Sequence, residues 1–319
     1  MKTAAMGMTR PEETVDRAFL EGVYRLADPK VSLASIASMI LGAAVAAHQG
    51  PLAWGWLALT VVGILGIEIA KNASGELVDF RSGVDQAVAP EDRTPFSGGK
   101  RVLVDGLLTQ RQTAAVSWIG YGLGIAIGIT LSAYRHPDVL WLGLAGVGLA
   151  YFYHADPLRL SYRGLGETAV ALTYGPLIAC GTYLVQRREW GDQIGWASIP
   201  LGILIGAFLW INELPDYRAD RGGGKRTLVV RLGPRTASRV YVVLVAVAYA
   251  VLLLLPAAGL PRTVWLGAAA LPFSVWAARR VMKNAESTSA IIPAQAATLL
   301  AFLAYSIGAS IGMLVHASG

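Results

Sequence analysis

Acidic and amide side chains follow the second apolar run of the chain at helical spacing. If a helix continues through them, Asn72, Glu76 and Asp79 fall within an arc of about 60°, because each residue turns a helix by about 100°. Asp85 comes after Gly83, and this glycine predicts a turn before it. The spacing therefore predicts three oxygen-bearing side chains that face one point at a helix end.

A second cluster of the same kind follows the sixth apolar run. Asn212, Asp216 and Asp220 are successive i, i+4 neighbours on one helix face, and Glu213 lies beside them. The two clusters are separated by four apolar runs, so they would lie on the same side of a membrane. This arrangement predicts a tandem pair of four-helix units with a ninth helix added.

Carboxylates this close together need a cation. Two of them about 5 Å apart repel by about 3 kcal/mol at an effective dielectric near 20. One source of compensation is ion pairing at a solvated helix end, for which the nearby candidates are Lys71, Arg81, Arg218 and Arg221. The other is Mg²⁺, which takes Asp, Glu and Asn oxygens together with water and phosphate. Since protein alone rarely holds Mg²⁺, the second interpretation predicts an anionic substrate.

Basic residues follow each cluster. They are Arg93, Lys100 and Arg101 after the first cluster, and Lys225, Arg226 and Arg231 after the second. Each of them alone is typical of a cytoplasmic loop of a membrane protein. Next to two acidic clusters, they predict a diphosphate-binding site.

The composition indicates what positions these side chains. Of the 319 residues 54% are hydrophobic and only 15% are charged, against about 25% charged in an ordinary soluble domain. A bilayer core needs about 20 mostly apolar residues per helix. We predict an all-α polytopic membrane protein with nine transmembrane helices around a central cavity. The expected spans are 31–48, 51–70, 112–133, 139–153, 164–185, 193–211, 240–255, 264–281 and 293–317.

The basic residues also predict an orientation. With the N-terminus in the cytoplasm, the only ones among the 27 Lys and Arg residues on the outer side are Arg135, Arg187, Arg188 and Arg262. We therefore expect a protein of the cell membrane with its site on the cytoplasmic side. Residues 1–30 would form a cytoplasmic lead-in, and 31–319 a single transmembrane domain. The net charge of +6 then reflects topology and anionic lipid rather than nucleic acid.

Longer stretches around the clusters resemble a known family. Residues 216–221 read Asp-Tyr-Arg-Ala-Asp-Arg and continue through 224–233, and the first cluster matches at Asn72, Asp79, Gly83 and Asp85. Residues 162–167 read Tyr-Arg-Gly-Leu-Gly-Glu, and residues 174–186 are a further match. Over nearly its full length the chain is similar to the UbiA superfamily of intramembrane prenyltransferases, and most similar to its MenA branch, the 1,4-dihydroxy-2-naphthoate polyprenyltransferases.

The chain departs from that branch at several positions. Gly75 and Glu76 stand where the family commonly has Asn-Asp, while Glu213 and Pro215 stand where the branch commonly has Asn and Arg. Glu68 and Lys71 are also unusual and could pair at i, i+3. These departures leave open an acceptor other than dihydroxynaphthoate.

The resemblance implies Mg²⁺-dependent transfer of a polyprenyl group from an allylic diphosphate to an aromatic quinone precursor, as in menaquinone biosynthesis. It implies two Mg²⁺ ions, one on Asn72, Glu76 and Asp79 and one on Asp216 and Asp220, with the three aspartates as catalytic residues. The implied substrate-binding residues are Asn72, Arg93, Lys100, Arg101, Tyr153, Tyr174, Asn212, Lys225 and Arg226.

Other functions remain open at this point. The acceptor could be 4-hydroxybenzoate, a tetrapyrrole or a lipid alcohol, or the prenyl chain could cyclise with no acceptor. Asp85 or Glu167 could orient an acceptor, and the spacing does not decide between them. From another class, an ion transporter would also carry intramembrane carboxylates. The outer half of the predicted bundle, however, holds few polar residues that could continue an ion path.

Overall fold

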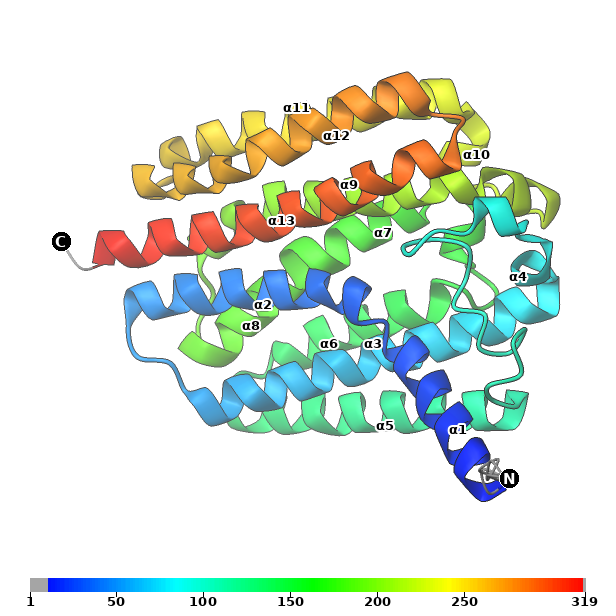
Figure 1. Ribbon diagram of the computed structural model, residues 1–319. Coiled ribbons are helices and arrows are strands. Elements are labelled where there is room, and N and C mark those ends of the chain that lie inside the picture. The colour runs from blue at the N-terminus through cyan, green and yellow to red at the C-terminus, as the bar shows by residue number, and fades with distance from the viewer. Residues whose placement is uncertain (1–10, 318–319) are drawn as a thin grey trace, which may run out of the picture.

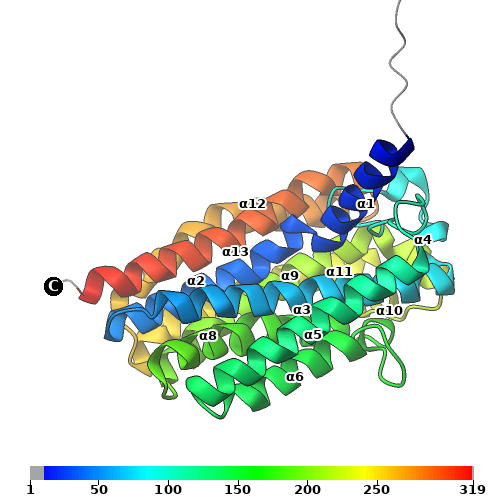
Figure 2. The ribbon, with the colours of Figure 1, turned by 90° about the horizontal axis from the view of Figure 1, so that it is seen from below.

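The computed structural model describes residues 11–317, and the side chains of 17–315, as a bundle of helices with no strand in that part of the chain. The long helices run roughly along one direction (Figures 1 and 2). Seven are long and apolar enough to cross a membrane. These are α2 (Pro29–Gln49), α3 (Trp54–Ser82), α5 (Gln110–Tyr134), the segment Gly166–Arg187, α9 (Asp192–Gly222), α11 (Pro234–Leu254) with its 3-10 extension, and α13 (Thr288–Ala317).

Shorter helical segments occupy the places of the other two expected spans. Helix α6 (Val139–Phe152) has 14 residues and reaches only about 21 Å at about 1.5 Å per residue. The 3-10 helix Arg262–Ala270 runs into α12 (Leu271–Asn284), and together they reach about 39 Å because a 3-10 helix rises about 2.0 Å per residue. The all-helical prediction is confirmed. The nine-span count and the tandem units stay predictions.

The segment Gly166–Arg187 is interrupted in its middle. Helix α7 (Gly166–Leu172) passes into a π-helical turn, Thr173–Leu177, before α8 (Ile178–Arg187). The turn contains Pro176, which has no N–H to donate to the preceding turn. Such turns occur often at functional sites, and this one carries Tyr174.

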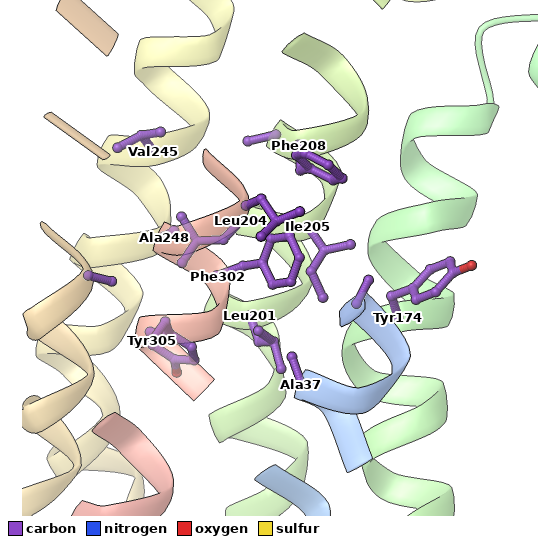
Figure 3. Close-up of a cluster of buried hydrophobic side chains, with 14 of the residues drawn as sticks. Ala37, Tyr174, Leu201, Leu204, Ile205, Phe208, Val245, Ala248, Phe302 and Tyr305 are labelled. Carbon is purple, nitrogen blue, oxygen red and sulfur yellow. The ribbon is translucent and has the colours of Figure 1, made fainter. Parts of the chain in front are cut away.

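The main apolar core lies between α2, α9, α11 and α13 (Figure 3). Phe208 and Phe302 meet there edge to face, with ring centroids 5.4 Å apart. The hydroxyl of Tyr305 is buried and donates to the Ala197 carbonyl at 2.9 Å, which satisfies the one polar atom of that ring. Tyr174 packs at the edge of this core, and its hydroxyl points away from it.

Small residues bring α3 and α5 close together. A Cβ added at Gly120 of α5 would lie 2.7 Å from the carbonyl oxygen of Gly66, and the Ser117 hydroxyl donates to the Ala70 carbonyl at 3.0 Å. This is the close packing that small residues spaced four apart permit in membranes.

We expect Gly120→Ala to destabilise the protein by about 1–3 kcal/mol, because the new methyl group would push against backbone. Gly122 lies on the same helix and has no atom within 4 Å of an added Cβ, so Gly122→Ala is the matched control. The measurement is the midpoint of thermal unfolding of the detergent-solubilised protein. Equal midpoints for the two variants would contradict the close contact.

Several elements that lie outside the long spans gather at one end of the bundle (Figure 1). They are α1 (Pro11–Ala27), α4 (Val84–Ala87), α10 (Leu228–Leu232) and the 3-10 turns Pro90–Asp92 and Leu160–Tyr162. The polar ends of α3 and α9 lie at this same end, whereas the C-terminal end of α13 lies at the opposite one. The fold therefore brings the two predicted clusters to one end of the bundle.

Candidate functional site

The first cluster lies on the last turns of α3, which ends at Gly83 in the left-handed conformation (φ 80°), so the predicted turn before Asp85 is confirmed. Asn72 donates from Nδ2 to the Leu26 carbonyl at 2.8 Å. Asp79 accepts from the Tyr162 hydroxyl at 2.7 Å. In contrast, Glu76 accepts from the Leu103 backbone N–H at 2.9 Å, so one of its oxygens fastens the loop after α4.

The second cluster lies near the end of α9. Asn212, Glu213 and Asp220 are buried, and Asp216 is partly buried. Oδ1 of Asn212, Oε2 of Glu213 and Oδ1 of Asp216 are buried and have no hydrogen-bond partner among the described residues. Buried polar atoms are normally paired, so these orphaned oxygens fit a ligand or a metal ion.

Lys225 joins the two clusters. Its Nζ lies 3.0 Å from Oδ2 of Asp79 on α3 and 3.6 Å from Oδ1 of Asp220 on α9. Its backbone N–H also donates to the Asp220 carbonyl at 2.9 Å, which fixes the loop after α9. One ammonium group therefore holds the ends of two helices that lie far apart in the sequence.

A polar cavity of about 730 Å³ opens between the two clusters. Of the predicted site residues, those that line it are Asn72, Asp79, Lys100, Arg101, Tyr153, Tyr174, Asn212, Asp216, Asp220 and Lys225. Glu76, Arg93 and Arg226 do not line it, and Arg93 donates to the Val88 carbonyl instead. On the side toward α2 and α9 the wall becomes apolar, with Ala34, Ile205 and Phe208.

The four basic residues that the sequence offered for ion pairing with the clusters have other partners. Arg218 lies 3.9 Å from Asp92, Arg81 donates to Gln110, and Arg221 donates to Tyr217. Lys71 donates to the Tyr174 hydroxyl. None of these four basic residues forms a salt bridge with a carboxylate of either cluster within the described part of the chain, where Lys225 takes that place.

The donor set fits Mg²⁺ only together with an anion. Among the described residues, no three His, Cys, Asp or Glu side chains form a group that could hold a metal ion by themselves. The unpartnered oxygens of Asn212 and Asp216 provide hard ligands at the cavity wall. A magnesium ion here would need water or phosphate oxygens to complete its shell, as the sequence predicts.

Burial and charge shift the ionisation of the groups around the cavity. Burial, reinforced by Asp79 and Glu76, raises the pKa of Asp85 to about 7. Burial lowers the pKa of His154 to about 3, so its ring is neutral at pH 7. Burial alone would lower the pKa of Lys225, but Asp79 and Asp220 outweigh it and hold that pKa well above its ordinary value. Lys225 therefore stays charged.

Asp85 should make the stability of the metal-free protein depend on pH. Its pKa in the folded protein is raised from 3.8 to about 7, so folding favours the neutral carboxyl. The contribution of Asp85 to the free energy of unfolding is complete below about pH 4 and is lost as the pH rises through 7. The total loss is at most about 4 kcal/mol. We expect the unfolding midpoint of the wild type to fall relative to Asp85→Asn between pH 5 and 8. Parallel curves would contradict this.

Sequence reasoning gave no role to two residues that bind the polar side chains of the cavity. Tyr162 is the partner of Asp79, and Asp28 pairs with Lys100 at 3.0 Å. Tyr162 begins the family-like stretch 162–167, but neither that stretch nor helical spacing links Tyr162 or Asp28 to the clusters. The one available signal was the position of Asp28 directly before Pro29, where an acidic residue is common at a helix start.

Comparison with known proteins gives a family match over most of the chain. Residues 35–304 match the model of the UbiA prenyltransferase family. The 1,4-dihydroxy-2-naphthoate octaprenyltransferase of Bacillus subtilis is 26% identical over 243 residues, which are 76% of this chain and 75% of that protein. The enzyme of the same name from Escherichia coli is 30% identical over 241 residues, 73% of this chain and 74% of that protein.

Solved structures share the fold. A UbiA homologue from Aeropyrum pernix in its apo form has a TM-score of 0.60 at 19% identity, covering 97% of this chain and 99% of that one. A UbiA homologue from Archaeoglobus fulgidus, bound to GPP and Mg²⁺, has a TM-score of 0.56 at 16% identity, covering 91% of this chain and 99% of that one.

Proposed function

Because the chain belongs to the UbiA prenyltransferase family, we propose that it transfers a polyprenyl group from an allylic diphosphate to 1,4-dihydroxy-2-naphthoate. It is a multi-pass membrane protein and a prenyltransferase, and its curated relatives include dihydroxynaphthoate octaprenyltransferases. The observation that carries the proposal is the polar cavity, which is lined by aspartates of both α3 and α9 and by an apolar wall. Such a cavity fits a substrate with a charged head and a hydrocarbon tail.

The head of the donor would lie between the two helix ends. Lys100, Arg101 and Lys225 line the cavity and supply charge for phosphate oxygens. Asn72 and Asp79 on one side, and Asp216 and Asp220 on the other, would hold Mg²⁺. When bound, Mg²⁺ stabilises the negative charge that develops on the diphosphate. Glu76 does not line the cavity and accepts from the Leu103 backbone, so this proposal leaves it out of the Mg²⁺ shell.

Transfer breaks the allylic C–O bond, and the diphosphate leaves with the electron pair. The ring carbon that bears the carboxylate forms the new C–C bond, and the electrons of its bond to the carboxylate return to the ring as CO₂ leaves. No proton has to be removed from that carbon. The cavity must exclude water while the allylic cation lasts, and the apolar wall at Ile205 and Phe208 supports this.

The protein would lie in the cell membrane, with its site on the cytoplasmic side. This orientation is supported by the uneven distribution of the 27 Lys and Arg residues between the two sides and by the position of both clusters at one end of the bundle. Residues 31–319 would form one transmembrane domain that contacts lipid on its outer surface.

The test is mass spectrometry of the product that purified protein forms from geranylgeranyl diphosphate and dihydroxynaphthoate. We expect a decarboxylated prenyl naphthalenediol with Mg²⁺ and none with EDTA. The same assay with 4-hydroxybenzoate, or with no acceptor, separates the other prenyl-transfer reactions. Ion flux in sealed vesicles without any prenylated product would contradict the proposal and favour transport.

A further inference from the structure

A second cavity adjoins the polar one. It has a volume of about 170 Å³ and lies between α3, α5, α6 and the segment Gly166–Arg187. Its wall is mostly aliphatic, as Ile67, Ile127 and Leu177 illustrate. Four residues line both cavities, namely Lys71, Tyr153, Val170 and Tyr174. The two cavities therefore share one wall.

Glu68 is the acidic residue of this second cavity. The residue is 6% exposed, and neither of its carboxylate oxygens forms a hydrogen bond of good geometry with a described residue, although the Tyr174 hydroxyl and the Lys71 ammonium lie close enough to interact with it. Removing a carboxylate from water without pairing it is costly. Such a residue within a transmembrane helix indicates a ligand that supplies the missing partner.

Lys71 lies one helical turn further along α3, in the shared wall. Its Nζ donates to the Tyr174 hydroxyl at 3.2 Å and lies 5.8 and 5.6 Å from the ring centroids of Tyr153 and Tyr174. It forms no salt bridge with Glu68 within 4.0 Å among the described residues. An ammonium group has three N–H donors, and the hydrogen bond to the Tyr174 hydroxyl uses one of them.

We propose that Glu68 and Lys71 bind the aromatic acceptor, whose ring occupies the second cavity. The acceptor carboxylate pairs with Lys71, and a ring hydroxyl donates to Glu68. This assignment rests on the proposed prenyl transfer and names the second substrate's site. The chemical class it selects is a hydroxylated aromatic acid.

The shared wall places this ring next to the donor. Lys71 and Tyr174 face both cavities, so a ring held by Lys71 lies beside the polar cavity in which the allylic carbon is released. Bringing two reactants into contact in this way supplies a large part of a rate enhancement.

The prenyl tail is a poorer occupant of the second cavity. A hydrocarbon offers no hydrogen bond to the Glu68 carboxylate, and it adds no partner for Lys71 beyond the Tyr174 hydroxyl and the two tyrosine rings. The polar cavity already has its own apolar wall, with Ala34, Ile205 and Phe208. The two charged side chains therefore distinguish the acceptor's cavity from the tail's.

Equilibrium binding tests this assignment without turnover. The dissociation constant of 1,4-dihydroxy-2-naphthoate is measured anaerobically by calorimetry on the full-length protein with Mg²⁺ and pyrophosphate. We compare wild type, Lys71→Met, Glu68→Gln and the control Lys283→Met, since Lys283 is exposed on α12 and lines neither of these two cavities. The second ligand is 1,4-dihydroxynaphthalene, which has the hydroxyls and no carboxylate.

We expect Lys71→Met to weaken naphthoate binding by about 10–100-fold and to change naphthalenediol binding by less than about twofold. Only the naphthoate has a carboxylate that can pair with the Lys71 ammonium, so only its binding loses a charged hydrogen bond. Glu68→Gln should weaken the binding of both ligands by about 5-fold, and Lys283→Met should change the binding of neither. Magnesium pyrophosphate binding shows that each variant is folded.

Three results would overturn the assignment. One is naphthoate binding to Lys71→Met within twofold of wild type. Another is equal weakening of both ligands, which would indicate a structural role. The third is a Lys71→Met variant that binds geranylgeranyl diphosphate more weakly and binds the naphthoate as wild type does, which would place the prenyl tail in this cavity. If instead Lys71-dependent binding is found and the wild type forms no prenylated product, the acceptor site stands and the proposed function fails.

Discussion

Replacing Asp216 with Asn is expected to lower kcat for prenyl transfer at least about 10³-fold. The Oδ1 atom of Asp216 lies in the cavity wall without a partner, and no salt bridge in the described part of the chain involves this residue. Asn keeps the shape and removes the charge that a divalent cation needs, so the metal's stabilisation of the leaving diphosphate is lost. The measurement is product formation at saturating Mg²⁺ and donor.

Asp192 provides the control for this variant, because it is an exposed aspartate at the opposite end of the same helix. Asp192→Asn should keep full activity, and the unfolding midpoint of Asp216→Asn should stay near that of wild type. Asp79→Asn should also abolish turnover, although it additionally removes the partner of Lys225. Wild-type activity in Asp216→Asn would remove the metal assignment.

Replacing Lys225 with Met should weaken both the donor site and the fold. The ammonium group lies 3.0 Å from the partly buried Asp79 and 3.6 Å from the buried Asp220, and without it these two carboxylates repel each other unscreened. Breaking a buried ion pair from one side costs about 3–5 kcal/mol of folding free energy. We also expect kcat/KM for the diphosphate to fall by about 10²-fold, because a buried charge for the phosphate is lost. Thermal unfolding and donor titration measure the two effects.

Magnesium should restore part of this stability, because an ion that binds only the folded state raises its free energy of unfolding. Arg221→Gln is the control, since Arg221 is exposed and its guanidinium contacts only the Tyr217 hydroxyl among the described side-chain hydrogen bonds. A Lys225→Met protein as stable as wild type in EDTA would show that the ion pair does not hold α3 and α9 together.

The local parts of the site could be predicted from the sequence. Helical spacing placed Asn72 and Asp79 on one helix end, and the apolar runs on either side of the charges gave most of the long helices. The glycine at position 83 marked the turn before Asp85 correctly. These features depend on neighbouring residues along the chain, which is the information that periodicity contains.

The contacts between distant segments could not be predicted in this way. Lys225 and Asp79 are 146 positions apart, and both the ion-pair and the phosphate-binding interpretations of the loop charges were compatible with the sequence. The bond between Glu76 and the Leu103 backbone depends on a loop path that no motif specifies. Likewise, only the packing of four helices shows that Glu68 faces a separate apolar cavity.

The opposite placement of the two chain ends has a consequence for topology. The N-terminal helix lies at the end of the bundle that carries the aspartates, and the C-terminal end of α13 lies at the other (Figure 1). If the bundle ends correspond to the two membrane faces, the chain crosses the bilayer an odd number of times. Helix α6 returns the chain from the end where Arg135 donates to the Val185 carbonyl to the end where His154 lies 4.0 Å from Asp79. A reporter enzyme fused behind α13 would then sit across the bilayer from the diphosphate.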